Sequence, residues 1–463
     1  MAMESTIRRI QDAVHGLMEF RGLETIVIEL LRTPELQRLR RIRQLGMAHQ
    51  VFPGAEHSRL AHGLGASFVS VRFARQLAQD RSSPVAEILR PGAEAVRDLA
   101  VAALCHDLGH GPLSHAWERV VVGEPYDAAQ WIDSLGLDSS DIALSKLKWH
   151  ELVGQGLLAF SLGDLHRLLE QHEEGFTLRL RLLLMGRYFP EYLPRLLSSD
   201  VDADRADYLL RDAHYCGVNY GRYDLDWLVS TSMVGRAPHG DGHVVGFDAR
   251  KAPRVVEQFL TARAAMYDTV YCHKTVRSVE GMMGLFLRRL RDVGLPATGA
   301  LASSLFSPYR KMLTGRALEC PELLRIDDYS ISMLIQAVAE DPAGDAVARD
   351  LASRITRREL LKAVDLSTEQ VINALEPQRM QEIYKAVKRY RGAEPECYVY
   401  IDKYPFTMFN TSDQDVSYFI DQAGSSDEIR HHEILGKRFQ DRLVCRIYTV
   451  EEAREDVRRV CLA

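Results

Sequence analysis

ALCHDLGHGPLSHAWE, residues 103–118, places an unusual group of polar side chains at the end of an apolar helical pattern. The group contains three imidazoles and two carboxylates: His106, Asp107, His110, His115 and Glu118. Two glycines and a proline interrupt the run, so side chains on both sides of the break can converge on one point. Imidazole and carboxylate ligands together suit a divalent cation such as Mn, Fe, Zn or Mg. The stretch therefore indicates a metal site beyond a helix end.

Two other segments carry matching ligands. Residues 52–66, FPGAEHSRLAHGLGA, supply His57, Arg59 and His62, and residues 198–212, SSDVDADRADYLLRD, supply five aspartates and two arginines. Each segment has a simpler interpretation by itself, because carboxylates are stabilised at helix N-termini and isolated histidines are common on surfaces and at helix caps. The presence of all three segments in one chain favours a shared metal site.

The composition is that of an ordinary globular protein. The chain has 463 residues, 46% of them hydrophobic and 26% charged, with a net charge of −6. No basic excess points to nucleic acid, so a polyanionic ligand must meet a local cluster of Arg and Lys. Seven scattered cysteines without a C-x-x-C motif indicate reduced thiols. Neither a signal-type apolar segment nor a long apolar run occurs, so we expect a cytoplasmic protein without a membrane partner.

Helical periodicity dominates the chain. We expect helices within residues 33–46, 93–109, 195–217 and 252–294, the last of which is long enough for two helices. An Asp-Gly pair within residues 230–248 predicts a β-hairpin. Near the C-terminus, two segments resemble strands and one resembles a closing helix: residues 396–405, 442–450 and 451–463. The expected fold is mainly α, with a helical core over residues 1–390 and a small α+β region over residues 391–463.

Three motifs carry a resemblance to a known family: AHGLGA at 61–66, CHDLGHGPLSH at 105–115 and DADRADYLLRD at 202–212. They resemble the HD-domain deoxynucleoside triphosphate triphosphohydrolases, of the SAM-and-HD-domain type and its bacterial relatives. DAVHG at 12–16, WHELVG at 149–154 and YCHKTV at 271–276 agree with this resemblance, which runs from about residue 8 to about residue 365. The HD motif would be centred on residues 57–215, and no SAM domain is expected before it.

The resemblance implies cleavage of a dNTP to a deoxynucleoside and inorganic triphosphate. The metal ligands would be His62, His106, Asp107 and Asp204, holding Mn, Fe, Mg, Zn or Ni and activating water for attack on the α-phosphorus. The residues lining the triphosphate would be His110, His115 and His150. His115 would donate a proton to the leaving O5′, and Glu118, where the family usually has Asp, would orient it. Residues 123–149 look like an insertion before His150.

Substrate contacts follow from the same resemblance. The implied set is Gln44, Leu45, Arg59, Arg205, Tyr208, Asp212, Arg263 and Tyr271. The three arginines match positions that contact the triphosphate, and Arg replaces the more usual Lys at 205. Gln44 and Asp212 resemble the pair that hydrogen-bonds the 3′-OH. Leu45 and Tyr271 resemble the pair that crowds C2′, where an unpaired ribose 2′-OH would cost about 1–3 kcal/mol. Surface ion pairs for the arginines, and core packing for Leu45 and Tyr271, remain alternatives.

The resemblance also implies regulation. Six residues stand at positions that bind activator nucleotides in the family: Arg32, Arg40, His273, Lys274, Arg358 and Lys362. A solvated helix face is the alternative for these basic residues. Arg32 replaces an acidic residue of guanine-reading members, and a guanidinium has only donors for the Watson–Crick N–H groups of guanine. We therefore expect a homo-oligomer, a tetramer or a dimer, whose activity does not depend on GTP.

Two other functions stay open at the level of sequence. The chain could be an HD phosphohydrolase for another phosphate ester, such as a nucleoside monophosphate, an alarmone or single-stranded nucleic acid. It could also be a nucleotide sensor without catalysis. The Gln44–Leu45 pair and Tyr271 argue against the first alternative, and the complete set of four ligands argues against the second.

Overall fold

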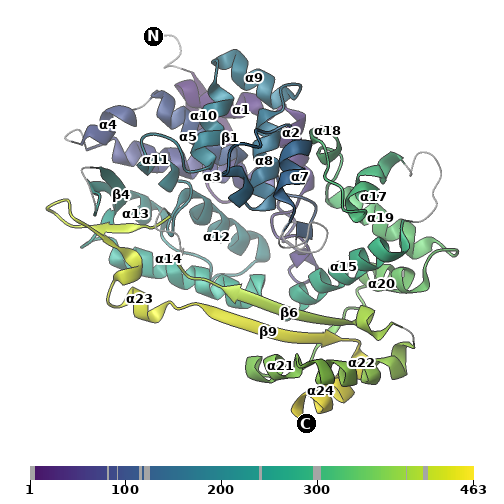
Figure 1. The fold of residues 1–463 in the computed structure, drawn as a ribbon. Coiled ribbons are helices and arrows are strands. Elements are labelled where there is room, and N and C mark those ends of the chain that lie inside the picture. Colours follow the sequence, from purple (N-terminus) through teal and green to yellow (C-terminus); the bar gives the residue numbers. More distant parts are fainter. Residues whose placement is uncertain are drawn as a thin grey trace.

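A body of helices makes up most of the molecule, and a long ribbon of strands lies along one side of it (Figure 1). The computed structural model describes residues 6–80, 83–90, 92–113, 117–118, 126–238, 242–295, 304–392, 394–409 and 415–463. The mainly α fold expected from the sequence is confirmed. The residues 114–116, which include His115, lie outside the described residues.

The chain opens with a β-hairpin, β1 Ile7–Asp12 and β2 Gly16–Arg21, followed by helices α1 Ile26–Leu30 and α2 Pro34–Arg38. The expectation of a single helix over residues 33–46 was wrong beyond residue 41. After a short 3₁₀ turn the backbone becomes extended, because Gln44 N–H donates to His57 O and Arg59 N–H donates to Ile42 O, both at 2.9 Å. Pairing with a distant segment therefore replaces the last helical turns.

Four helices surround the polar motifs: α3 Arg59–Leu77, α5 Glu94–Cys105, α8 Trp149–Ala159 and α12 Ala203–Cys216. Helix α3 packs against both α5 and α12. The Asp202 side chain caps α12 by accepting from Arg205 N–H, and Gly217 ends the helix in the left-handed conformation. The expected helices within residues 93–109 and 195–217 are thus confirmed.

The long pattern over residues 252–294 forms two helices, α14 Pro253–Met266 and α15 Lys274–Val293, joined by a π-helical turn at Tyr267–Tyr271. The other helices of the described residues are α4 Pro84–Ile88, α7 Ala128–Ser134, α9 Asp164–His172, α10 Phe176–Leu184, α11 Tyr192–Arg195, α13 Leu225–Ser230, α17 Ser307–Leu313, α18 Cys320–Leu323, α19 Asp328–Glu340, α20 Ala346–Arg357, α21 Thr368–Ala374, α22 Pro377–Arg391, α23 Leu435–Arg438 and α24 Arg454–Leu462.

Strands near the C-terminus pair with strands from earlier in the chain. The expected hairpin is confirmed by antiparallel β3 Ser232–Arg236 and β4 His243–Asp248, and β7 Tyr418–Ile420 lies parallel to β4, followed by β8 Ser426–Glu428. The ribbon in Figure 1 consists of β6 Val399–Phe406 and β9 Arg442–Thr449, and β5 Lys362–Ala363 extends it. The C-terminal segment is therefore joined to the helical part by hydrogen-bonded strands.

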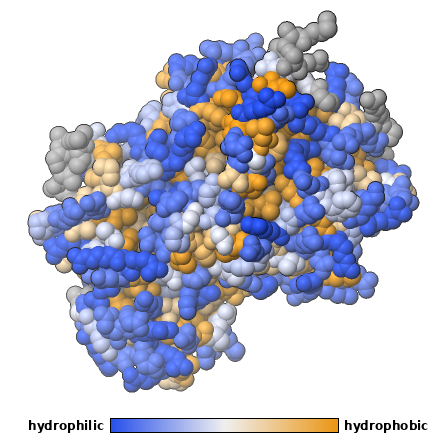
Figure 2. All heavy atoms as spheres, turned by 180° about the vertical axis from the view of Figure 1, so that it is seen from behind, coloured by the Kyte–Doolittle hydropathy of each residue, from blue (hydrophilic) through white to orange (hydrophobic). Residues whose placement is uncertain are grey.

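The opposite face of the molecule is mostly hydrophilic, with apolar residues gathered in patches near its centre (Figure 2). In the part of the chain that the structure describes, no helix is both long and apolar enough to cross a membrane.

A close contact between two glycines fixes how α8 lies against the turn after α5. A Cβ atom on Gly109 would lie 2.0 Å from His150 O, whereas a Cβ on Gly154 would meet only Gly109 N, at 3.6 Å. We expect Gly109→Ala to lower the free energy of unfolding by about 1–3 kcal/mol, because the added methyl group meets backbone atoms. Gly154→Ala, the matched control, should be neutral or stabilising by up to about 1 kcal/mol, since alanine favours a helix. Urea unfolding followed by circular dichroism measures both; equal effects would contradict the prediction.

Candidate active site

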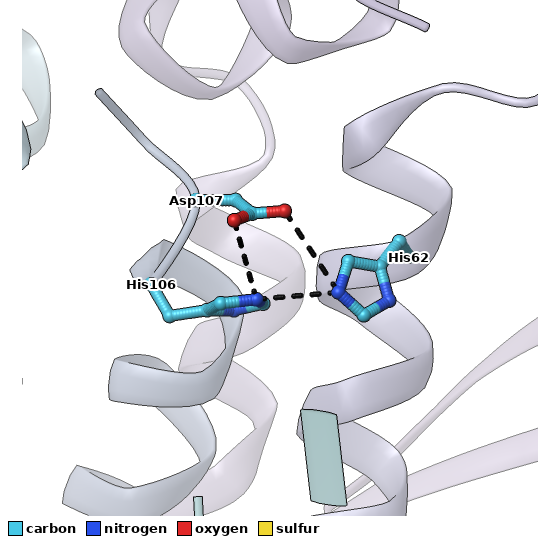
Figure 3. A group of neighbouring side chains, drawn as sticks. All are labelled: His62, His106 and Asp107. Atoms are coloured by element: carbon cyan, nitrogen blue, oxygen red, sulfur yellow. Dashed lines mark hydrogen bonds and ion pairs between the residues drawn. The ribbon is translucent and has the colours of Figure 1, made fainter. Parts of the chain in front are cut away.

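Three of the expected ligands meet between α3 and the end of α5 (Figure 3). His62 lies in the first turns of α3, His106 follows the last residue of α5, and Asp107 comes next. His62 Nε2 is 3.2 Å from His106 Nε2, and the Asp107 carboxylate is 3.5 Å from His106 Nε2 and 3.8 Å from His62 Nε2. The ligand atoms of all three residues lie within 4.8 Å of one another.

The fourth expected ligand, Asp204, reaches the same point from the start of α12. Its Oδ1 atom lies 2.9 Å from His62 Nε2 and 3.4 Å from His106 Nε2. The Asp204 side chain is 30% exposed, whereas the His62 side chain is fully buried, so the cluster opens toward solvent on the side of Asp204.

Second hydrogen bonds fix the orientation of both imidazoles. His106 Nδ1 lies 2.7 Å from Ala103 O, and His62 Nδ1 lies 2.7 Å from Asp207 Oδ2. Because carbonyl and carboxylate oxygens only accept, both Nδ1 atoms donate, and each ring, when it is neutral, directs its Nε2 lone pair at the cluster. Two imidazole nitrogens and two carboxylates at one point attract a cation. These four side chains are of the kinds that bind a divalent metal ion.

The pKa values of the cluster show the same attraction of these side chains for a positive charge. Burial opposes protonation of His62, but hydrogen bonds to Asp204 and Asp207 outweigh it and raise the pKa of the ring to about 10. Burial opposes ionisation of Asp107, yet the Arg59 guanidinium and neighbouring imidazoles hold the pKa of that carboxyl well below its usual range. Protons therefore compete with a metal ion for these atoms.

A second cluster adjoins the first on the side of α8. The His110 and His150 rings are stacked with centroids 4.0 Å apart, and Asp107 Oδ1 lies 3.2 Å from His110 Nε2. The Glu118 carboxylate lies 3.1 Å from His110 Nδ1 and 2.9 Å from His150 Nδ1. Burial, Arg59 and His150 lower the pKa of His110 to about 4, so its ring is neutral at pH 7. The sequence linked Glu118 to His115, which lies outside the described residues, and did not reveal its contacts with this stacked pair.

The three arginines expected to meet phosphate all have partners within the chain. Arg59 donates to Asp107 Oδ2 at 2.5 Å, and Arg263 donates to Met408 O at 2.7 Å and to Thr407 O at 3.2 Å. Arg205 donates to Ser199 O and to the Asp202 carboxylate. Arg59 and Arg263 are buried, and all three residues line the same cavity.

A third group of polar atoms lies beside the clusters. Tyr271 donates its hydroxyl hydrogen to Asp212 Oδ2 at 2.7 Å, and His57 Nε2 lies 2.8 Å from Asp212 Oδ1. Among the described residues, Gln44 Oε1 is buried and accepts no hydrogen bond. A buried acceptor without a donor is costly, so this atom points to a ligand group that would donate to it.

These groups share one cavity of about 1410 Å³. The expected site residues that line it are Gln44, Leu45, Arg59, His106, Asp107, His110, Glu118, His150, Asp204, Arg205, Tyr208, Asp212, Arg263 and Tyr271. His62 lies behind this wall with its Nε2 atom directed at the cluster (Figure 3). The structure thus brings these residues from six separate segments of the chain to one place.

The six residues expected to bind an activator lie at the surface instead. Five of them are exposed, and His273, at the start of α15, is half-buried with its ring against Phe52. Arg358 donates to Gln50 O at 3.0 Å, and Arg40 donates to the Gln37 side chain at 3.0 Å.

Sequence reasoning missed several supports of the site. Arg38 is fully buried and donates to Leu108 O at 3.3 Å and His110 O at 2.7 Å, which holds the turn that carries the histidines. Burial lowers its pKa to about 10. Asp207 was noted only as part of an acidic run, although its position one helical turn after Asp204 placed it on the same side of α12.

Comparisons with known proteins found relatives in sequence and structures of similar fold. No family model matches the chain. The uncharacterized protein YwfO of Bacillus subtilis is 30% identical over 424 residues, which cover 90% of this chain and 82% of YwfO. A crystal structure of a phosphohydrolase from Bacteroides thetaiotaomicron has a TM-score of 0.71 and 23% identity, and covers 96% of this chain and 99% of that one. This second likeness concerns the fold alone.

Relatives with a named activity match a smaller part. The deoxynucleoside triphosphate triphosphohydrolase SAMHD1 homolog of Dictyostelium discoideum is 30% identical over 59% of this chain and 48% of its own length. The corresponding SAMHD1 protein of Homo sapiens is 27% identical over 50% of this chain and 36% of its own length. The chain spans half or less of these relatives. From the extended match with YwfO, the shared motifs and the common fold, the chain belongs to the HD-domain phosphohydrolase family that includes the deoxynucleoside triphosphate triphosphohydrolases.

Proposed function

We propose that this HD-domain phosphohydrolase cleaves deoxynucleoside triphosphates to a deoxynucleoside and inorganic triphosphate with a divalent metal ion. One observation carries the proposal: the cluster of His62, His106, Asp107 and Asp204 adjoins a cavity that also holds buried arginines and the Gln44–Asp212–Tyr271 group. The cavity therefore combines a cation site, positive charge for phosphate and polar atoms for a sugar. The named activity of the SAMHD1 relatives supports the same substrate class.

The residues that would hold the metal are His62, His106, Asp107 and Asp204. When bound, a divalent cation supplies a nucleophile at neutral pH and offsets phosphate charge. Asp207 and Ala103 O keep the two Nε2 atoms directed at that point. Arg59 lies beside Asp107, where its guanidinium would balance the charge of that carboxylate. It would also donate to a phosphate oxygen of the substrate.

Protons would be handled by the stacked histidines. Because its pKa is lowered to about 4, the His110 ring would face the phosphates without adding charge. His150 and Glu118 keep that ring in place. His115 stays our proposed donor to the leaving O5′.

Sugar selection would depend on Gln44, Leu45, Asp212 and Tyr271. The free acceptor of Gln44 and the Asp212 carboxylate suit a 3′-OH donor. Leu45 is half-buried against the core and lines the cavity next to Gln44, so it offers an apolar wall where a 2′-OH would need a partner.

The metal assignment is tested with the double variant His106→Ala, Asp204→Asn. It removes two ligands without separating Arg59 from Asp107. We expect metal content and dNTP hydrolysis to fall by more than about 100-fold, because even the outer partners of metal ligands are worth 10–100-fold. Elemental analysis and release of triphosphate measure the two effects, with the half-exposed His172→Ala as the control. Full metal content in the double variant would refute the assignment.

Selectivity for the deoxyribose is tested with dATP and ATP. We expect a kcat/KM ratio of at least about ten in favour of dATP, equivalent to roughly 1.4 kcal/mol. Leu45→Ala should reduce this ratio, because it removes the apolar wall near C2′, whereas Leu178→Ala, at an exposed position, should not. Equal kcat/KM values in the wild-type protein would favour a phosphohydrolase for another ester.

We also propose an oligomer, a tetramer or dimer, whose activity is independent of GTP. Arg32 is exposed just before α2 and offers only donors to a guanine edge. We expect GTP to change the rate of dNTP hydrolysis by less than about twofold. The enzyme would be activated by a dNTP or would need no activator. The rate of dNTP hydrolysis with and without GTP measures the dependence on GTP, and light scattering measures the size of the oligomer. Activation of an inactive enzyme by GTP alone, by about tenfold or more, would show that Arg32 does not exclude guanine.

A further inference from the structure

The turn of the N-terminal hairpin reaches the back of the metal cluster. This turn is the DAVHG segment, residues 12–16, between β1 and β2. Asp12 Oδ1 accepts from the backbone N–H groups of Val14 and His15, both at 2.9 Å. The His15 side chain is 3% exposed, and its Nε2 atom lies 2.6 Å from Asp207 Oδ1. A hairpin far from the HD motif in sequence therefore contacts the carboxylate that orients His62.

Asp207 is fully buried and surrounded by donors. Oδ1 accepts from His15 at 2.6 Å and from Arg211 Nη2 at 2.9 Å, and Oδ2 accepts from His62 Nδ1 at 2.7 Å and from Arg211 Nε at 2.8 Å. A carboxylate offers about four lone-pair directions, so these four contacts leave it little freedom to rotate. The donor from His15 is one of the two that hold Oδ1.

The hairpin holds Arg211 as well. Arg211 Nη1 donates to Asp12 Oδ2 at 2.9 Å, and Nη2 donates to Asp12 Oδ1 at 3.2 Å. Gly65 of α3 leaves the space for this group, since a Cβ atom there would lie 1.8 Å from Asp207 Oδ1. The hairpin, α12 and α3 are thus built around one carboxylate–guanidinium pair directly behind His62.

We infer that His15 is a positioning residue for the metal site, acting through Asp207 on the His62 ring. The inference rests on the proposed function, because it assumes that His62 holds a cation. The Nδ1–H···Asp207 hydrogen bond fixes which nitrogen of His62 faces the cluster, and partners of this kind tune metal affinity. Without the His15 donor, Asp207 keeps only Arg211 as a partner at Oδ1, so the carboxylate that orients the His62 ring is held less firmly.

The competing explanation is packing alone, because the His15 ring also lies 5.8 Å from the Phe68 ring. Two substitutions separate the explanations. His15→Leu removes the donor and keeps an apolar side chain, whereas His15→Gln keeps an N–H group that can reach Asp207. Arg9→Gln, which breaks the exposed Arg9–Glu19 pair of the same hairpin, is the control for the hairpin itself.

The measurement is Mn²⁺ affinity of the full chain, from the electron paramagnetic resonance signal of free Mn²⁺, together with the Tm of the metal-free protein. We expect His15→Leu to weaken binding about 10–100-fold. His15→Gln should recover most of that loss, and Arg9→Gln should bind as the wild type does. If His15→Leu does not fold, Asp12→Asn, which weakens the bridge to Arg211, should still reduce Mn²⁺ affinity.

Each outcome supports or contradicts the role of His15 as a positioning residue. Mn²⁺ binding by His15→Leu within about twofold of the wild type would overturn the inference and leave the proposed function standing. Equal losses in the Leu and Gln variants, with equal falls in Tm, would assign His15 to packing and also overturn it. Unchanged affinity in a folded Asp12→Asn variant counts against it where His15→Leu is unfolded. A wild-type protein that binds no divalent cation would overturn the inference and the proposed metal-dependent function together.

Discussion

Hydrogen-bond acceptors crowd at one point between α3, α5 and α12, and the rest of the structure depends on this crowding. Two imidazole Nε2 atoms and two carboxylates repel one another unless a proton or a metal ion lies among them. Their positions therefore have to be enforced by the surroundings. Ala103 O and Asp207 orient the rings, Arg59 balances Asp107, and Arg38 holds the backbone of the turn. Each of these supports comes from a different segment, which explains why so many helices converge on a small cluster.

The positive side of the cavity is built differently. Arg205 and Arg263 are held by carbonyl and carboxylate oxygens of the chain, so they are ordered before any ligand arrives. A preorganised guanidinium loses less entropy when it meets a phosphate. The partners of Arg263 are carbonyls of residues 407 and 408, so the segment after β6 takes part in shaping the cavity wall.

The motifs and the family resemblance singled out the residues that the structure brings together, because His106 and Asp107 lie at the end of a strongly periodic helix and Asp204 lies in a capped one; their role as metal ligands stays a prediction. The sequence was misleading where distant pairing prevails, as after Arg41, where residues 42–44 pair with 57–59 rather than continue a helix. It did not reveal the contacts of His15, Asp207 and His57, since these contacts join residues 145–192 positions apart. Neither periodicity nor spacing carries information about which buried polar groups of separate segments meet.

The shared contacts of Asp207 have a thermodynamic consequence for the N-terminus. Coupling between two sites is reciprocal, so whatever the hairpin contributes to cation affinity, a bound cation returns to the hairpin as resistance to opening. The first strand is largely exposed, and the second buries Met18 and Phe20 in the core. The amide hydrogens of β1 and β2 should therefore exchange with solvent more slowly when a cation occupies the cluster around His62, although these strands do not line that site.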